Sequence, residues 1–150
     1  MRRAAHPLND PAAIPYLEIL APAAPASARR ELVRAVTDGI VRGFDVAPST
    51  VTVYFVPIGA DDYAHEGVHG LPPTGARVFV KVHAFRRDAA RRRAAAEAMT
   101  PALAACFDTP ARNVAIYFLD RERDEVAHEG HLASDDDTAT PAVPATDPAL

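Results

Sequence analysis

Two parts of this 150-residue chain repeat one another at a constant offset of 63 positions. Phe44-Asp45 recurs as Phe107-Asp108, and the phrase Ala-His-Glu-Gly at residues 64–67 recurs at residues 127–130 without a gap. Matches that keep one offset over so long a stretch indicate a duplicated structural unit. The folded part of the chain is therefore expected to be two copies of one small unit.

Each copy is predicted to form a strand, a helix and a second strand. In the first copy, residues 16–20 alternate between polar and apolar, and residues 50–56 are rich in β-branched and aromatic side chains; both patterns favour strands. Ser27 is the expected N-cap of the segment between them. That segment repeats apolar residues at the spacing of one helical face, at Leu32, Val33, Val36, Ile40 and Phe44. The pattern predicts an amphipathic helix.

The second copy repeats this plan with a helix of different character. Strands are expected from Val78 to Ala84 and from Val114 to Leu119. The helix between them is expected to be capped by Asp88 and to end at Phe107, and its many alanines leave only a small apolar stripe. Pro101 lies inside it and removes a backbone hydrogen bond, so we expect a kink there.

The two copies together predict the fold class. Two strands joined by a helix of this length pair in parallel through a right-handed crossover. The expected architecture is an α/β (α+β) fold, in which tandem β-α-β units form a four-stranded mixed sheet with two helices on one face. Strand residues such as Val78, Phe79 and Val80 are apolar on both faces, so the other face of the sheet would be apolar and bare. A bare apolar face predicts self-association.

The composition separates a folded region from the two ends of the chain. Residues 1–13 are expected to be an irregular leader, and residues 133–150, rich in Pro, Ala and Asp, a flexible tail. Residues 14–132 are expected to form one domain, with repeat one at about 14–70 and repeat two at about 76–132.

Charge and cysteine content exclude several classes of protein. The net charge of −4 argues against a nucleic-acid partner, whose phosphates attract a basic excess. Arg, Asp or Glu interrupts every apolar run before it reaches the ~18–20 residues that a membrane crossing needs, so no membrane partner is expected. The single Cys106 cannot form an internal disulfide, which favours a reducing cytoplasm, and it is interpreted as a core thiol.

The duplicated unit resembles the tautomerase superfamily, in particular the 4-oxalocrotonate tautomerase-like members that fuse two β-α-β units in one chain. Members of this superfamily begin with a proline that opens the first strand, and Pro15 in Ile14-Pro15-Tyr16 matches that residue. The resemblance covers residues 14–132. It implies a homotrimer with buried sheet faces, no cofactor, and keto–enol tautomerisation of a small 2-oxo or enol carboxylic acid.

The chemistry of the superfamily depends on the nitrogen of that proline. A free secondary amine in an apolar pocket has a lowered pKa and can act as a general base. In this sequence Pro15 is bonded to Ile14, so its nitrogen is an amide without useful basicity. Pro15 is therefore expected to act as the base only if residues 1–14 are removed.

The resemblance points to four further site residues. Arg86 and Arg87 follow the third strand, where fused members carry arginines that bind a substrate carboxylate; the alternative is that they begin a solvated basic face. Tyr63 matches an aromatic residue that lines the pocket of one-unit members; the alternative is a loop aromatic packed on a neighbouring subunit. Asp120 lies where the dehalogenase branch places a water-activating carboxylate; the alternative is a surface acid that ends a strand.

Two arginines that one-unit members use are missing, with Thr52 and Ala115 at the second-strand position and Pro25 at the position in the first unit. Two functions therefore stay open. One is a tautomerase-type enzyme in which Pro15 is the base and Arg86 or Arg87 binds a small carboxylate-bearing molecule. The other is a divergent member without this chemistry, a trimeric binding or assembly protein.

Residues 65–69 read His-Glu-Gly-Val-His and match a zinc-binding pattern of metalloproteases. Zinc binding by that pattern needs a helix with both histidines on one face, whereas Gly67 and the nearby glycines and prolines disfavour a helix. The second copy keeps Ala-His-Glu-Gly but loses the spacing of the histidines. The phrase is predicted to form a loop after each second strand, in which glycine adopts a positive φ, and no metal is expected.

Overall fold

The computed structural model describes residues 14–135, and the expected leader at 1–13 and most of the expected tail lie outside them. The helices and strands, in chain order, are β1 (Tyr16–Pro22), α1 (Ala26–Phe44), β2 (Thr52–Ile58), β3 (Ala64–His65), β4 (Val68–His69), β5 (Val78–Phe85), α2 (Ala89–Cys106), β6 (Val114–Arg121), β7 (Ala127–His128) and β8 (His131–Leu132). Single 3-10 turns precede β2 and β6, at Pro48–Thr50 and Ala111–Asn113, and a third follows β6 at Arg123–Glu125.

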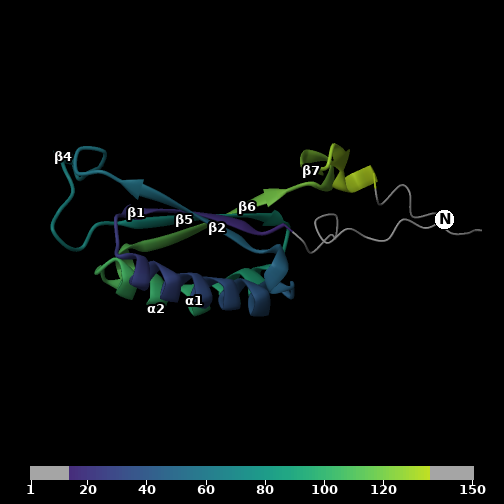
Figure 1. Ribbon diagram of the computed structural model, residues 1–150, viewed down its shortest axis with the longest axis horizontal. Helices are drawn as coiled ribbons and strands as arrows, with labels where there is room; N and C mark the ends of the chain where they lie inside the picture. Colours follow the sequence, from purple (N-terminus) through teal and green to yellow (C-terminus); the bar gives the residue numbers. More distant parts are fainter. Residues whose placement is uncertain (1–13, 136–150) are drawn as a thin grey trace, which may run out of the picture.

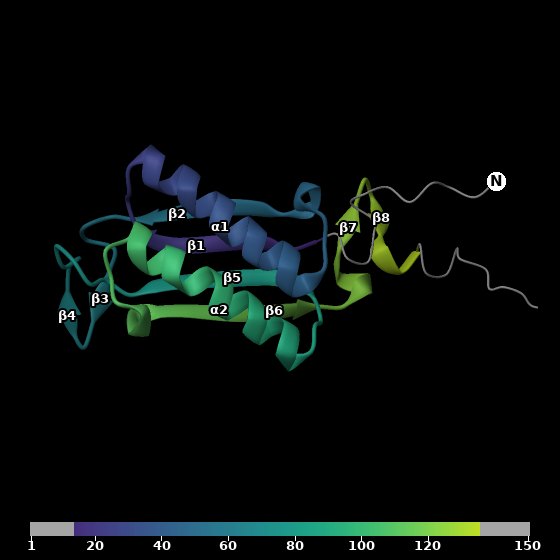
Figure 2. The same ribbon diagram turned by 90° about the horizontal axis from the view of Figure 1, so that it is seen from below.

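The four long strands form one mixed sheet in the order β2-β1-β5-β6. β1 pairs in parallel with β2, and β5 with β6, while the central pair β1 and β5 is antiparallel with Tyr16 opposite His83. Helices α1 and α2 run in opposite directions across the same face of this sheet (Figures 1 and 2). The predicted four-stranded mixed sheet with two helices on one face is confirmed.

The hydrophobic core lies between the sheet and the two helices. Along β1, Leu17 and Ile19 are buried under the helices, while Tyr16 and Glu18 alternate onto the opposite face. The helices contribute fully buried side chains at Leu32, Val36, Ile40, Met99 and Leu103. The opposite face leaves large apolar side chains exposed, among them Tyr54, Val56, Phe79 and Tyr117.

Small residues allow the two helices to approach closely. A Cβ atom placed on Gly43 of α1 would lie 3.0 Å from the backbone nitrogen of Ala95 in α2. One placed on Gly39 would lie 3.0 Å from Cγ of Met99. The small side chain of the fully buried Ala95 therefore fits a close helix–helix contact, in which there is little space for a larger one.

Several expected boundaries shift by a few residues. Ser27 was expected to cap the first helix, but α1 begins at Ala26, after Pro25, and no side chain caps it. Pro25 has φ −58° and ψ 148°, an extended conformation that lets the helix begin directly after it, so Ser27 falls inside the first turn. The predicted cap at Asp88 is confirmed, since its side chain accepts a hydrogen bond from the Arg91 N–H at 2.9 Å. α2 continues through Pro101.

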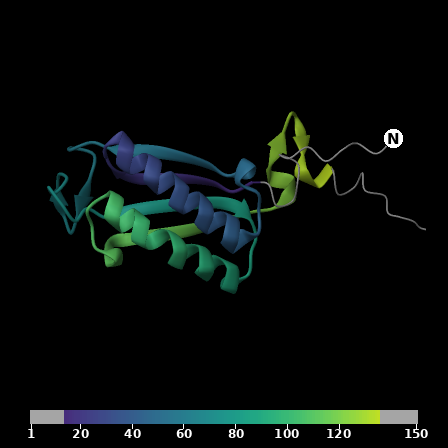
Figure 3. The ribbon, with the colours of Figure 1, turned by 60° about the horizontal axis from the view of Figure 1, so that its bottom comes forward.

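The repeated phrase Ala-His-Glu-Gly forms a two-strand hairpin in each copy. Its turn has positive φ at both central residues, 54° and 75° at Glu66 and Gly67, and 53° and 79° at Glu129 and Gly130. Two consecutive positive φ values are characteristic of the tight turn that matches the twist of a hairpin. The hairpin β3–β4 lies at one end of the sheet and β7–β8 at the other (Figures 2 and 3).

Candidate functional site

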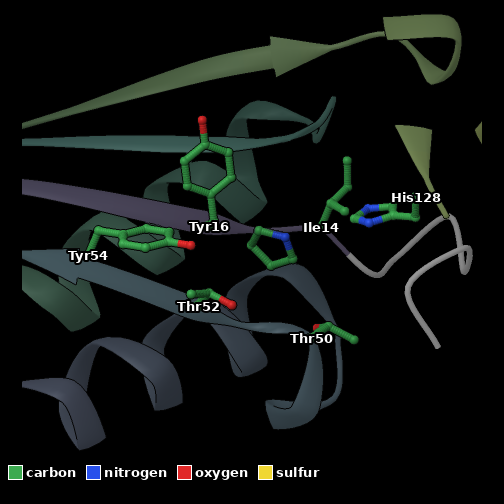
Figure 4. Close-up of a pocket in the computed structure, with 7 residues that line it drawn as sticks. Ile14, Tyr16, Thr50, Thr52, Tyr54 and His128 are labelled. Carbon is green, nitrogen blue, oxygen red and sulfur yellow. The ribbon is translucent and has the colours of Figure 1, made fainter. Parts of the chain in front are cut away.

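A cleft of about 440 Å³ opens at the start of β1. It is lined by Ile14, Pro15, Tyr16, Thr50, Thr52, Tyr54 and His128. Figure 4 shows Thr52 and Tyr54 reaching it from β2 and His128 lying beside Ile14. The Pro15 side chain is buried, and its carbonyl accepts a hydrogen bond from the Thr52 N–H at 3.4 Å. The Pro15 nitrogen is an amide here, because it is bonded to Ile14.

The hairpin from the second copy reaches Pro15 because of the strand directions. β6 runs antiparallel to β1, so the chain that leaves β6 emerges where β1 begins. This places His128 at the cleft, and its Nε2 atom is buried without a hydrogen-bond partner among residues 14–135. An unsatisfied buried nitrogen that lines a cleft is available to a ligand.

A second cleft of about 360 Å³ adjoins the first and shares Ile14, Tyr16 and His128 with it. Its remaining wall includes His83 from β5 and Arg121 at the end of β6. The two clefts together surround the first residues of β1 and bring two histidines and one arginine to this end of the sheet.

His83 is almost fully buried, with 6% of its surface exposed, and both of its ring nitrogens have hydrogen-bond partners. Its Nε2 lies 2.6 Å from Oε2 of Glu18, and its Nδ1 lies 3.0 Å from Nη2 of Arg121. The ring stacks on Tyr16 with the centroids 4.2 Å apart and the planes inclined by 6°. A guanidinium only donates hydrogen bonds, so Nδ1 must be the unprotonated nitrogen and Nε2–H donates to Glu18.

Arg86 and Asp120 lie at this end of the sheet but on its helix-covered side. Asp120 accepts two hydrogen bonds from Arg92 of α2, at 2.9 and 3.0 Å, and forms an ion pair with Arg86 at 3.2 Å. Its carboxylate is therefore held by two arginines. In the described part of the chain Asp120 lines neither of the clefts at Pro15.

Arg87 lies in a third cleft, of about 450 Å³, that shares no residue with the cleft at Pro15. Its guanidinium donates to the Phe85 carbonyl at 2.8 Å and lies 5.1 Å from the ring centroid of Phe44. Burial, and to a lesser degree the nearby charge of Arg91, lower the pKa of Arg87 from its ordinary value. Arg86 lines the same cleft.

Tyr63 lies at the opposite end of the sheet from Pro15. Its hydroxyl accepts a hydrogen bond from the Arg77 N–H at 3.0 Å, directly before β5 begins. Tyr63 lies in the loop that follows β2. Because β2 runs parallel to β1, this loop lies at the end of the sheet opposite to Pro15. Within one chain, Tyr63 and Pro15 are not brought together.

Two further observations bear on the chemistry. Within residues 14–135, no group of three His, Cys, Asp or Glu side chains is close enough to hold a metal ion, and His65 and His69 lie on hairpin strands and not on a helix. No helix of the described chain combines the length and the apolar character that crossing a membrane requires.

Comparison with known proteins gives matches at the level of structure. No family model matches the sequence, and no curated protein matches it. A fused 4-OT described as an asymmetric trimer superposes with a TM-score of 0.72 at 18% identity, over 80% of this chain and 97% of that one. A native fused 4-OT gives 0.72 at 20% identity over the same shares. The macrophage migration inhibitory factor of Toxoplasma gondii gives 0.65 at 16% identity, over 78% of this chain and 98% of that one.

These solved structures belong to the tautomerase superfamily, and they match nearly their whole length to the two-unit sheet described above. The chain therefore has the tautomerase fold, in the two-unit arrangement of the fused 4-OT structures.

Proposed function

We propose that this protein catalyses proton transfer between carbon and oxygen in a small enolisable 2-oxo acid, a keto–enol tautomerisation, at the cleft that begins at Pro15. The observation that carries the proposal is the position of Pro15, which opens β1 and lies against a cleft of about 440 Å³. The tautomerase fold supports it.

The base in this proposal is the nitrogen of Pro15 after the peptide bond to Ile14 has been cleaved. Cleavage converts an amide into a secondary amine, and the rings of Tyr16 and Tyr54 give it apolar surroundings. Such surroundings disfavour the charged form of an amine and leave a larger neutral, basic fraction near neutral pH.

The carboxylate of the substrate needs an arginine close to that nitrogen. Arg86 and Arg87 were expected in this role, but they line the third cleft, and their guanidinium groups are held by Asp120 and by backbone carbonyls. Arg121 lines the cleft that adjoins Pro15. We therefore assign the carboxylate to Arg121, whose planar guanidinium matches a carboxylate in two parallel hydrogen bonds.

A trimer is part of the proposal. The sheet face without helices exposes large apolar side chains, and three of the fused 4-OT structures are described as trimers, two asymmetric and one symmetric. Burial of that face between three copies would remove the apolar surface from water.

The test compares a chain that begins at Pro15, released by a protease site placed before it, with the same chain carrying Pro15→Ala. Ketonisation of phenylenolpyruvate, followed by ultraviolet absorbance, should be much faster with the first than with the second. Equal rates for the two chains would exclude Pro15 as the base.

A further inference from the structure

We infer that Glu18, His83 and Arg121 form a second acid–base site, which works while Pro15 is still bonded to Ile14, and whose base is Nδ1 of His83. The ligand class is a small carboxylate with an enolisable carbon next to its carbonyl. The inference rests on the proposed function for its class of reaction, and it differs in the residue that moves the proton.

The hydrogen bonds around His83 fix which nitrogen is basic. Arg121 can only donate, so its 3.0 Å contact requires a lone pair on Nδ1, and the proton of the neutral ring is on Nε2. Nε2–H then donates to the Glu18 carboxylate at 2.6 Å. A carboxylate in this position orients the ring and stabilises the positive charge that appears when Nδ1 takes a proton.

Arg121 connects the base to the ligand. Its guanidinium covers Nδ1 of His83 and also lines the 360 Å³ cleft. A carboxylate forms charge-assisted, two-point hydrogen bonds with a guanidinium, which are stronger than one bond to a neutral ring nitrogen. A carboxylate that enters the cleft would therefore draw Arg121 away from His83 and leave the Nδ1 lone pair beside the ligand.

The proposed reaction needs only the enol substrate and His83. Nδ1 takes the hydroxyl proton of the enol, the O–H electron pair becomes the carbonyl π bond, and the pair of the carbon–carbon double bond moves onto the adjacent carbon. That carbon then takes the same proton back from the imidazolium. One O–H bond and one C=C bond are exchanged for one C–H bond and one C=O bond, and no co-reactant is consumed.

The charged groups around His83 suit a base that gains and then releases a proton in each reaction. Glu18 faces His83 from β1 and Lys81 lies directly opposite Glu18 on β5, while Arg121 approaches from β6. Across the cleft lie Glu125 and His128, and the Nε2 atom of His128 has no hydrogen-bond partner within the described residues. Tyr16 covers one face of the His83 ring and fixes its plane.

The first arm of the experiment measures binding in the full chain with benzoate, a carboxylate that cannot enolise. The ring ¹⁵N signals of His83 should show an unprotonated Nδ1 and a protonated Nε2. Benzoate should shift the Nδ1 signal in the parent and in the control His65→Gln, which changes the histidine of the distant hairpin. The shift should be lost in Arg121→Gln. No benzoate response in the parent would overturn the carboxylate site.

The second arm measures phenylenolpyruvate ketonisation by the full chain. His83→Asn should lower kcat on the order of 100-fold, the usual loss for a general base, while His65→Gln keeps the parent rate. Glu18→Gln, which preserves the volume and the hydrogen bond, should lower kcat with little change in KM. This variant keeps the test valid if His83→Asn fails to fold. An unchanged kcat in a folded His83→Asn chain would overturn the base assignment.

The two arms separate this inference from the proposed function. If only the chain that begins at Pro15 is active, the proposed function stands and the role of His83 as base is overturned. If neither form is active, the proposed function fails and the base role fails with it, while an Arg121-dependent response to benzoate would still support the carboxylate site.

Discussion

Arg92 donates two hydrogen bonds to the carboxylate of Asp120, at 3.0 Å to Oδ1 and 2.9 Å to Oδ2. This contact joins the first turns of α2 to the end of β6. The two side chains are 29% and 27% exposed, so solvent screens the pair less than it screens a surface ion pair. In the structure Asp120 connects a helix to the sheet.

We expect Asp120→Asn to lower the free energy of unfolding by about 1 kcal/mol, because it removes one charge of a partly buried ion pair in which Nη2 of Arg92 contacts both carboxylate oxygens. The measurement is urea unfolding followed by circular dichroism. Asp38→Asn is the matched control, since Asp38 is 55% exposed and its single pair with Arg42 should contribute almost nothing. Equal losses for the two variants would contradict the structural role of Asp120.

The repeat and its periodicity were enough to predict the architecture. Matches at one offset indicated two equivalent units, and strand and helix periods within each unit indicated the β-α-β order. The cap at Asp88 followed from local chemistry and is confirmed. The start of α1 was predicted wrongly. The helix begins directly after Pro25, so Ser27 lies in its first turn and does not cap it.

The candidate site could be predicted only in part. Pro15 was named because the resemblance to the tautomerase superfamily places a proline at the start of the first strand. Glu18 and His83 are 65 positions apart, and their contact depends on the register of the antiparallel pair β1 and β5, which no short turn fixes because the two strands are not consecutive in the chain. His128 was interpreted only as a loop residue, since its approach to Pro15 depends on the opposite directions of β6 and β1.

The close contact between α1 and α2 predicts that alanine is tolerated less well at Gly43 than at Gly39. Gly43→Ala should reduce stability by about 1 kcal/mol more than Gly39→Ala, because a methyl group on Gly43 meets the Ala95 backbone whereas one on Gly39 meets the flexible side chain of Met99. Both variants gain the same helix propensity, so the difference in unfolding free energy isolates the crowding. A larger loss at Gly39 would show that the helices are not this close at Gly43.

The bare sheet face predicts the effect of one charge on assembly. Phe79 and Tyr117 form an edge-to-face pair on this face, with ring centroids 5.6 Å apart, and Tyr117 is 51% exposed. Light scattering of the parent should give three times the 16.0 kDa of one chain. Tyr117→Lys should give a single chain, because a buried lysine without a partner is unfavourable. Ala94→Lys on the exposed side of α2 is the control and should remain a trimer.

Cys106 at the end of α2 predicts a pH dependence of stability. Burial raises the pKa of its thiol above the ordinary value, and the charge of Arg29 opposes this shift more weakly. A raised pKa means that the folded chain holds the thiol proton more tightly than the unfolded chain does. The contribution to stability is therefore complete below the pKa of the unfolded thiol, near 9.0, and is lost as the pH rises through the higher pKa of the folded state.

Urea unfolding of the parent and of Cys106→Ala between pH 7 and pH 10 measures this effect of the partly buried Cys106 thiol. The parent should lose stability relative to the variant above about pH 9, because only the parent must ionise a partly buried thiol. Alkylation by iodoacetamide at pH 8 should also be slower in the folded parent than in the urea-unfolded chain, since the thiolate is the reactive form. A constant difference between the two stability curves across this pH range would show that the Cys106 thiol titrates alike in the folded and unfolded chains.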